Sequence, residues 1–152
     1  MKQYLFDTGP LVALLKGRAG AEQLMRGWVL SDEAATCHVV YGEAIEYIKS
    51  HQDFALLRQN LRNLLQAVTP YRLTYAILER YADLRRAMRP PHGAGLIGDM
   101  DTLIAATALE HGLTIVTLDG DMARVPGLSA MVIPRAALRC AEHVTIHTGT
   151  SG

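Results

Sequence analysis

Short apolar runs alternate with helical segments along this chain of 152 residues, and that order limits the folds open to it. Apolar runs predict strands at residues 4–6, 35–39, 113–117 and 131–133, and an edge strand or turn at residues 69–73. Apolar residues spaced three and four positions apart predict helices. One starts at Pro10, and the others span residues 21–30, 43–49, 54–67, 75–89 and 101–111. Strands that alternate with helices are joined by parallel crossovers. The sequence therefore predicts an α/β fold with a mostly parallel central sheet flanked by helices.

The pattern ends at Pro134, which sets the expected domain boundary. A chain of this length can bury one hydrophobic core without structural metal or disulfides. We expect one domain over residues 1–134 and a C-terminal tail, partly frayed, over residues 135–152.

Composition excludes several classes of protein. Hydrophobic residues make up 49% of the chain and charged residues 20%, which is ordinary for a globular protein and rules out disorder as the main state. No apolar run approaches the roughly 20 residues that a membrane helix needs, and Asp7 interrupts the first run before a signal peptide could form. The two cysteines, Cys37 and Cys140, are too few for a disulfide framework. We therefore expect a cytoplasmic protein.

Charge is unevenly distributed although the formal net charge is zero. Residues 58–92 contain seven arginines and two acids, for a net charge of +5, and residues 93–128 contain one arginine and five acids, for a net charge of −4. Two interpretations are open. The segments are solvated helix faces of opposite sign, or a basic arm lies beside an acidic site.

Acidic side chains follow the predicted strands. Asp7 comes directly after the first strand, and Asp119 comes after the strand at residues 113–117. Glu43 follows the second strand, and Asp101 begins a helix. Ligands of open parallel sheets bind outside the carboxyl ends of the strands. Each acid also has a structural explanation, as a helix cap, an Asp-Gly turn or a surface residue.

Several carboxylates at one edge of a sheet require neutralisation. Two carboxylates about 4 Å apart repel by roughly 4 kcal/mol at an effective dielectric constant near 20. A divalent cation removes that repulsion, and ligands that are all oxygen select Mg²⁺ or Mn²⁺ over zinc. Such a metal can activate water and stabilise displacement at phosphorus.

Four segments together resemble the PIN-domain ribonucleases, and within them the VapC-type toxins of prokaryotic toxin–antitoxin pairs. The segments are residues 5–11 (LFDTGPL), 40–43 (VYGE), 97–114 (IGDMDTLIAATALEHGLT) and 116–128 (VTLDGDMARVPGL). They come in the order and at the spacing of the family and span residues 4–128. The third and fourth are the specific ones, whereas the first two would be weak evidence by themselves.

The resemblance implies a PIN-like three-layer fold and a set of site residues. It assigns the metal-binding, catalytic quartet to Asp7, Glu43, Asp101 and Asp119. It makes Asp99 and Asp121 additional or alternative ligands, and Thr8 and Thr117 the hydroxyls that orient the carboxylates. One departure is Met122, which stands where the family usually has Phe and which affects packing rather than chemistry.

The function implied is that of an endoribonuclease toxin that depends on Mg²⁺ or Mn²⁺ and leaves a 5′-phosphate and a 3′-hydroxyl. Its implied partners are RNA, a small cognate antitoxin that inhibits it, and a second copy of the chain in a homodimer. Arg85, Arg86 and Arg89 precede the loop that leads to Asp101, and we expect them to guide the RNA backbone. The alternative for these arginines is a favourable interaction with the C-terminus of their helix.

Two other functions compete with this interpretation. One is a PIN-like protein that binds RNA or acts as a scaffold without catalysis, for which an eroded quartet would be typical. The other is an α/β domain that binds a small molecule and whose acids are only helix caps; such a protein would not bind Mn²⁺.

Overall fold

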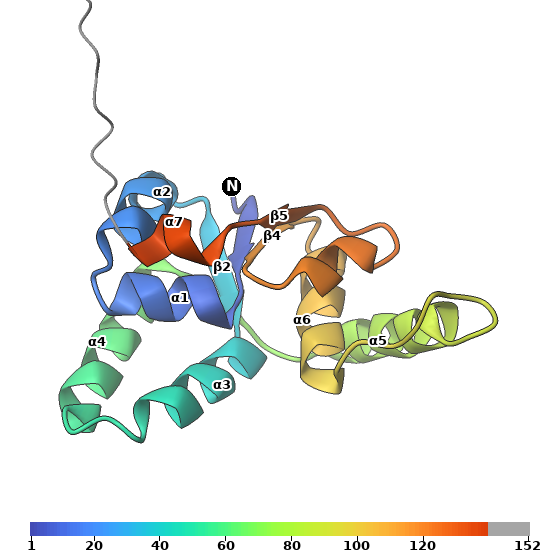
Figure 1. The fold of residues 1–152 in the computed structure, drawn as a ribbon, viewed down its shortest axis with the longest axis horizontal. Helices are drawn as coiled ribbons and strands as arrows, with labels where there is room; N and C mark the ends of the chain where they lie inside the picture. Colours follow the sequence, from blue (N-terminus) through green and yellow to red (C-terminus); the bar gives the residue numbers. More distant parts are fainter. Residues whose placement is uncertain (140–152) are drawn as a thin grey trace, which may run out of the picture.

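A parallel five-stranded sheet lies at the centre of the computed structural model, which describes residues 1–139 (Figure 1). Its strands are β1 (Tyr4–Phe6), β2 (Ala34–Cys37), β3 (Thr69–Tyr71), β4 (Thr114–Thr117) and β5 (Ala130–Val132). They are arranged in the order β3-β2-β1-β4-β5, and every neighbouring pair is parallel. The predicted α/β class and parallel sheet are confirmed.

Helices cover both faces of the sheet, as the resemblance implied. They are α1 (Thr8–Leu15), α2 (Ala19–Leu30), α3 (His38–Ile48), α4 (Phe54–Ala67), α5 (Tyr75–Met88), α6 (Asp99–Glu110) and α7 (Arg135–Arg139), with a 3₁₀ turn η1 (Gly120–Arg124) after β4. The chain moves one way across the sheet from β1 to β3 and the other way from β3 to β5. Because parallel crossovers are right-handed, α1 to α4 lie on one side of the sheet and α5 and α6 on the other (Figure 1).

The central strands β1 and β4 form the middle of the core. Leu5 and Phe6 are fully buried, and β1 pairs with β4 so that Phe6 lies opposite Val116. Strands buried on both faces are expected to be continuously apolar, which explains the unbroken runs at these positions. Asp7 directly follows β1 and Asp119 comes two residues after the end of β4, so the buried centre of the sheet positions these two acids.

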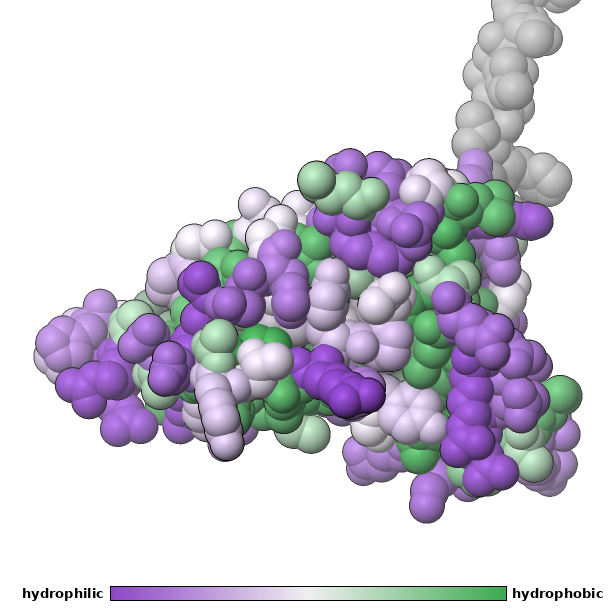
Figure 2. Space-filling view, turned by 180° about the vertical axis from the view of Figure 1, so that it is seen from behind, coloured by the Kyte–Doolittle hydropathy of each residue, from purple (hydrophilic) through white to green (hydrophobic). Residues whose placement is uncertain are grey.

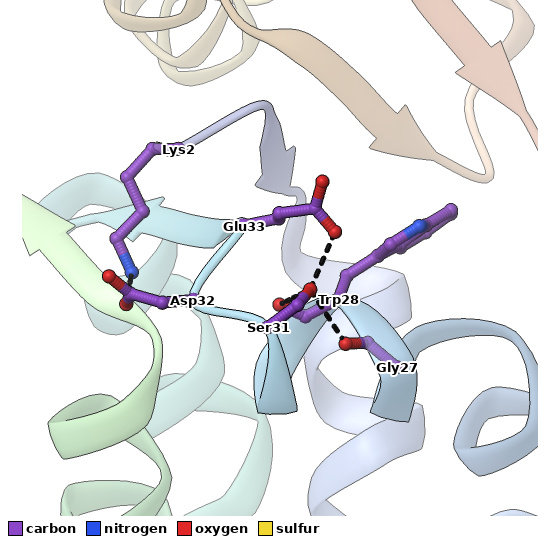
Figure 3. A network of polar contacts seen from close by, with 6 residues as sticks. All are labelled: Lys2, Gly27, Trp28, Ser31, Asp32 and Glu33. Atoms are coloured by element: carbon purple, nitrogen blue, oxygen red, sulfur yellow. Dashed lines mark hydrogen bonds and ion pairs between the residues drawn. The ribbon is translucent and has the colours of Figure 1, made fainter.

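A polar network fixes the turn between α2 and β2 at the amino end of the sheet (Figure 3). Ser31 donates a hydrogen bond to the Glu33 carboxylate at 2.6 Å and another to the Gly27 carbonyl at 2.9 Å. Asp32 has a φ of 61° and pairs with the Lys2 ammonium at 2.5 Å. The pKa of Asp32 is lowered, chiefly by the hydrogen bond from Lys2. This network lies at the end of the sheet opposite the acids.

Three differences from the sequence-based expectation concern the site or the domain boundary. Strand β2 ends at Cys37 and α3 begins at His38, so Glu43 lies in the second turn of a helix that we predicted to begin at that residue. Helix α6 begins at Asp99, two residues earlier than expected.

The third difference is α7, which lies in the segment expected to be a frayed tail. Leu138 is buried in this helix, and α7 packs against α1 and α2. The rest of the predicted tail, residues 140–152, lies outside the described residues.

The surface has one strongly polar end. Figure 2 shows that the tip formed by the end of α5 and the loop after it is mostly hydrophilic, whereas hydrophobic side chains emerge among polar ones on the rest of that face. No helix within residues 1–139 is long and apolar enough to cross a membrane.

Candidate metal centre

The candidate site lies where the strand order reverses direction. Strand β1 has β2 on one side, reached through α1 and α2, and β4 on the other, reached much later in the chain. In open α/β sheets this reversal leaves a crevice at the carboxyl ends of the strands. Asp7 directly follows β1, and Thr117 ends β4, so topology brings both to that crevice.

Asp7 is held rigidly in the crevice. It is the N-cap of α1 and accepts a hydrogen bond from the Thr8 amide at 2.8 Å on one carboxylate oxygen. The other oxygen accepts from the Thr117 hydroxyl at 2.6 Å. Burial raises the pKa of Asp7, and the nearby charge of Asp119 raises it further, while the two hydrogen bonds lower it. Asp7 therefore caps α1 as predicted, and its carboxylate still lies in the crevice.

Glu43 reaches the same place from α3. The Thr8 hydroxyl donates a hydrogen bond to its carboxylate at 2.6 Å. Thr8 therefore serves two acids, through its amide to Asp7 and through its hydroxyl to Glu43. The orienting role that the resemblance implied for Thr8 and Thr117 fits these contacts.

Asp101 completes a group of three carboxylates. It lies in the first turn of α6, and carboxylate oxygens of Asp7, Glu43 and Asp101 all lie within 4.8 Å of one another. Burial, followed by the charges of Asp7 and Asp119 and then of Glu43 and Asp121, raises the pKa of Asp101 to about 6. Four neighbouring acids thus act on one side chain.

Asp119 lies beside this group of three rather than within it. Its amide donates to the Thr117 hydroxyl at 3.0 Å, and its carboxylate accepts from the Asp121 amide at 2.9 Å. The Asp-Gly turn expected from sequence is part of η1, which Asp119 caps. The charge of Asp119 still raises the pKa of both Asp7 and Asp101, so the predicted quartet shares one electrostatic site.

The donor set fits a hard divalent cation. Asp7, Glu43 and Asp101 offer only carboxylate oxygens, which suit Mg²⁺ or Mn²⁺. They come from three separate segments of the fold, and hydroxyl and amide donors orient two of them. A bound cation would offset the burial and the neighbouring negative charges that together raise the pKa of Asp101. The acidic triad is thus compatible with a metal.

Comparison with known proteins agrees with this geometry. The family model described as PIN domain matches residues 4–128. The chain belongs to the PIN domain family. That match covers the same span as the four motifs, so the resemblance inferred from sequence is confirmed. No curated protein sequence matches the chain significantly.

The PIN domain also resembles several solved structures, one of which is described as a toxin–antitoxin complex. VapBC2 from Rickettsia felis, bound to a DNA fragment of its promoter, aligns with a TM-score of 0.75 at 19% identity over 86% of this chain and 98% of that one. FitAcB from Neisseria gonorrhoeae aligns with a TM-score of 0.73 at 18% identity over 85% and 96%. A toxin–antitoxin complex from Klebsiella pneumoniae aligns with a TM-score of 0.65 at 26% identity over 86% and 100%. These likenesses confirm the PIN-like fold.

Asp99 faces away from the three carboxylates of this PIN domain. Its carboxylate accepts a hydrogen bond from the Tyr81 hydroxyl at 2.8 Å and pairs with the Arg85 guanidinium at 3.2 Å. Asp99 therefore ties α6 to α5. Asp121 pairs with Arg124 at 3.3 Å on the exposed surface and reaches the site only through its charge.

The three arginines expected to guide RNA lie on α5 and the residue after it. Arg85 is occupied by Asp99 and by the Ile97 carbonyl at 3.4 Å. Arg86 and Arg89 line a separate hollow at the tip of α5. None of the three lines the cleft that contains Asp7 and Asp119.

Sequence reasoning missed two supporting residues. A Cβ on Gly9 would lie 2.6 Å from the Leu118 side chain, so glycine lets α1 approach the segment that carries Asp119. The Thr36 hydroxyl, fully buried, donates to the Phe6 carbonyl at 2.9 Å and ties β2 to the end of β1. Gly9 precedes Pro10 and Thr36 lies within β2, but only the packing of neighbouring elements reveals their partners.

Proposed function

We propose that this PIN domain is a VapC-type toxin, an endoribonuclease that depends on Mg²⁺ or Mn²⁺ and is inhibited by a cognate antitoxin. The observation that carries the proposal is the convergence of Asp7, Glu43 and Asp101 within 4.8 Å at the crevice of the sheet. A set of helix caps would have no reason to point at one another, whereas a metal site requires it.

The three carboxylates are the groups that would hold the metal. A bound divalent cation supplies a water of lowered pKa and stabilises charge on a phosphodiester undergoing in-line displacement. Thr117 and the Thr8 amide hold Asp7 in one orientation, and the Thr8 hydroxyl does the same for Glu43. Asp119 adds negative charge at the edge of the site, and Asp101, whose pKa is raised to about 6, must be ionised to bind a cation.

An antitoxin partner is supported by the complexes that the fold resembles and by a groove whose lining is apolar in part. The groove lies between the ends of α1, α2 and α4, with Leu14, Leu15, Val29, Leu30 and Leu64 among its lining residues. Leu30 is 76% exposed there. An amphipathic antitoxin segment would cover such a surface.

We further propose a homodimer and a cytoplasmic location. Large apolar side chains are exposed at the start of α5 and on α6, namely Leu73, Tyr75, Leu78 and Met100. A second copy of the chain would bury them. The proposed substrate, RNA, and the proposed antitoxin are both present in the cytoplasm.

RNA cleavage by purified variants tests the proposal. The wild-type chain with Mg²⁺ or Mn²⁺ should cleave RNA and leave 5′-phosphate ends, and Asp7→Asn and Asp101→Asn should each abolish cleavage while remaining folded. The matched control is Asp53→Asn, the same chemical change at an exposed acid that makes no side-chain cap, and it should cleave at the wild-type rate. Cleavage by either site variant near the wild-type rate contradicts the proposal. A wild-type chain that binds RNA without cleaving it would favour the non-catalytic alternative.

A further inference from the structure

A cleft of about 640 Å³ extends from the acidic site between α1 and α7. Asp7 and Asp119 line one part of it. Its other charged lining residues are cations, namely Lys16, Arg18, Arg135 and Arg139. Among the residues that the structure describes, Asp7 and Asp119 are the only acids that line this cleft.

One face of α1 forms a wall of the cleft. Gly9, Val12, Ala13 and Lys16 all line it, and their spacing of three, four and seven residues puts them on one helical face. Gly9 lies beside the acidic site, and Lys16 lies about 10 Å further along the helix axis at 1.5 Å per residue. The small residues between them leave the wall open. The cleft therefore runs from the acids at one end of α1 to a cation at the other.

A face of α7 forms the facing wall. Arg135, Leu138 and Arg139 line the cleft at spacings of three and four residues. Leu138 is 2% exposed and anchors α7, which packs against α1 and α2, whereas both arginines are exposed. Arg18, at the start of α2, is also exposed. One buried leucine thus positions two guanidinium groups beside the cleft.

Lys16 is held in place at its end of the cleft by an aromatic residue. Its ammonium donates to the Tyr47 hydroxyl at 2.5 Å and lies 4.6 Å from the centre of that ring. Tyr47 lies four residues after Glu43 on α3, so both side chains project from the same face of that helix. The lysine is therefore oriented by the same helix that contributes a carboxylate to the metal site.

These four cations lack acidic partners in the described part of the chain. The ion pairs found within residues 1–139 involve other basic residues, namely Lys2, Arg80, Arg85 and Arg124. Four unpaired positive charges along one cleft repel one another unless an anion lies among them. The cleft is thus complementary to a chain of negative charges whose end reaches the metal site.

We propose that this cleft binds the phosphates of a single RNA strand next to the bond that is cut, with Lys16, Arg18, Arg135 and Arg139 as the phosphate-binding residues. The inference rests on the proposed ribonuclease function. It places the RNA path along this cleft instead of along Arg85, Arg86 and Arg89. A strand whose scissile phosphate lies at the carboxylates would place its neighbouring phosphates along α1, where the cations lie. An open cleft that binds the phosphates and leaves the nucleobases facing outward suits single-stranded RNA.

RNA is a better occupant than an acidic protein segment because the cleft contains part of the acidic site itself. An acidic polypeptide that filled it would bring carboxylates against Asp7 and Asp119. A phosphodiester strand would instead bring its reacting group to them through the metal. The groove between α2 and α4 offers a separate, apolar surface for a protein partner.

The test is RNA binding by the full chain carrying Arg135→Ala with Arg139→Ala, and by a second variant carrying Lys16→Ala with Arg18→Ala. Binding of a labelled, unstructured RNA oligonucleotide is measured in EDTA, which prevents cleavage, over a range of salt concentrations. Each pair of changes should weaken binding on the order of tenfold and reduce the magnitude of the salt slope by about 1.4, since each phosphate contact on a single strand contributes about 0.7.

The matched control is Arg86→Ala with Arg89→Ala, which removes the same charge from the hollow at the tip of α5. It should bind RNA like the wild type, and Arg135→Lys with Arg139→Lys should restore binding because the charges are kept. If the wild type cleaves RNA but both cleft variants bind it with unchanged affinity and salt slope, the inference is wrong and the ribonuclease proposal stands. Loss of affinity for a polyglutamate peptide without loss for RNA would also overturn it. A wild type that neither binds nor cleaves RNA would refute the proposed function itself.

Discussion

Two threonine hydroxyls determine how the acidic side chains lie. Thr117 donates to Asp7 at 2.6 Å and accepts from the Asp119 amide at 3.0 Å, so one hydroxyl connects two acids. The Thr8 hydroxyl likewise donates to the Glu43 carboxylate at 2.6 Å. Residues that orient metal ligands are often nearly as important as the ligands themselves.

The first prediction concerns Thr117. Thr117→Val keeps the volume but removes both hydrogen bonds, so Asp7 loses a donor that lowers its pKa. We expect Mn²⁺ affinity and RNA cleavage to fall about 10–100-fold, the usual cost of losing such a supporting residue. Thr117→Ser should recover most of both, because it restores the hydroxyl. Wild-type Mn²⁺ affinity in the valine variant would show that Thr117 has no orienting role.

The second prediction concerns Asp101 and pH. Its pKa is raised to about 6 in the folded protein from an ordinary value of 3.8, so the folded chain binds this proton more tightly than the unfolded chain. The metal-free protein should therefore gain stability from this group as pH falls through 6 toward 3.8, and should lose it as pH rises through 6. Thermal melting at pH 7.5 and 5.5 without metal measures the effect.

Asp101→Asn provides the comparison, because other groups also titrate in this range. The variant should melt higher than the wild type at pH 7.5 and should show a smaller gain on acidification. The Asp32–Lys2 pair does not interfere, since the lowered pKa of Asp32 makes its contribution fall only at lower pH. An identical pH response in both proteins would contradict the assignment of the raised pKa to Asp101.

The third prediction separates Asp99 from the ligands. Asp99→Asn should leave Mn²⁺ affinity within about twofold of the wild type, since its carboxylate binds Tyr81 and Arg85 instead. The loss of stability should be below about 1 kcal/mol, because the ion pair is largely exposed. Asp101→Asn, two residues away on the same helix, should lose most of its Mn²⁺ affinity. A loss in Asp99→Asn as large as in Asp101→Asn would make Asp99 a ligand.

Among the elements, those with clear periodicity were predicted closely. Helix α4 and strand β1 have the predicted bounds, and α5 differs by one residue. The start of α3 was missed because residues 37–41 contain two valines and a Tyr, which favour strands. In the fold, Val39 and Val40 are buried against the core from a helix, so packing overrides local propensity.

The acids of the site could be predicted from sequence because each lies shortly after the end of a strand or the start of a helix. Which of the acids converge on one point could not be predicted, since the direction of the Asp99 side chain depends on how α6 packs against α5. The cluster of cations in the cleft could not be predicted from sequence either, because Lys16 and Arg135 are far apart along the chain. They line one cleft only because α7 packs against α1.

The fourth prediction concerns the loop after α5. A Cβ on Gly93 would lie 2.4 Å from the Ala87 carbonyl oxygen and 2.6 Å from the Met88 Cα, both backbone atoms that cannot move aside. Gly93→Ala should therefore destabilise the protein by about 1–3 kcal/mol, the range for overpacking. Chemical denaturation measures the change.

Gly27→Ala is the matched control. Gly27 lies inside α2 with no heavy atom within 4 Å of the position of a new Cβ. The same substitution there should stabilise the protein by up to about 1 kcal/mol, because alanine favours the helix. Equal effects at the two positions would contradict the close approach at Gly93.

At the scale of the whole molecule, a neutral chain concentrates opposite charges around one crevice. Three carboxylates converge where the strand order reverses, and four cations line the cleft that leads to them. Net charge is therefore a poor guide to the ligands of this protein, since local fields rather than the total decide where a polyanion binds. The whole account depends on the three carboxylates acting as one metal site.

Calorimetric titration with Mn²⁺ near pH 6 tests that claim most directly, on the wild type, Asp101→Asn and the control Asp53→Asn. The wild type and Asp53→Asn should bind Mn²⁺ and release protons, because the pKa of Asp101 lies at about 6 before the metal binds. Asp101→Asn should lose most of the binding and of the proton release. Absence of Mn²⁺ binding in the wild type, or equal binding in Asp101→Asn, would contradict the assignment of a metal site to Asp7, Glu43 and Asp101.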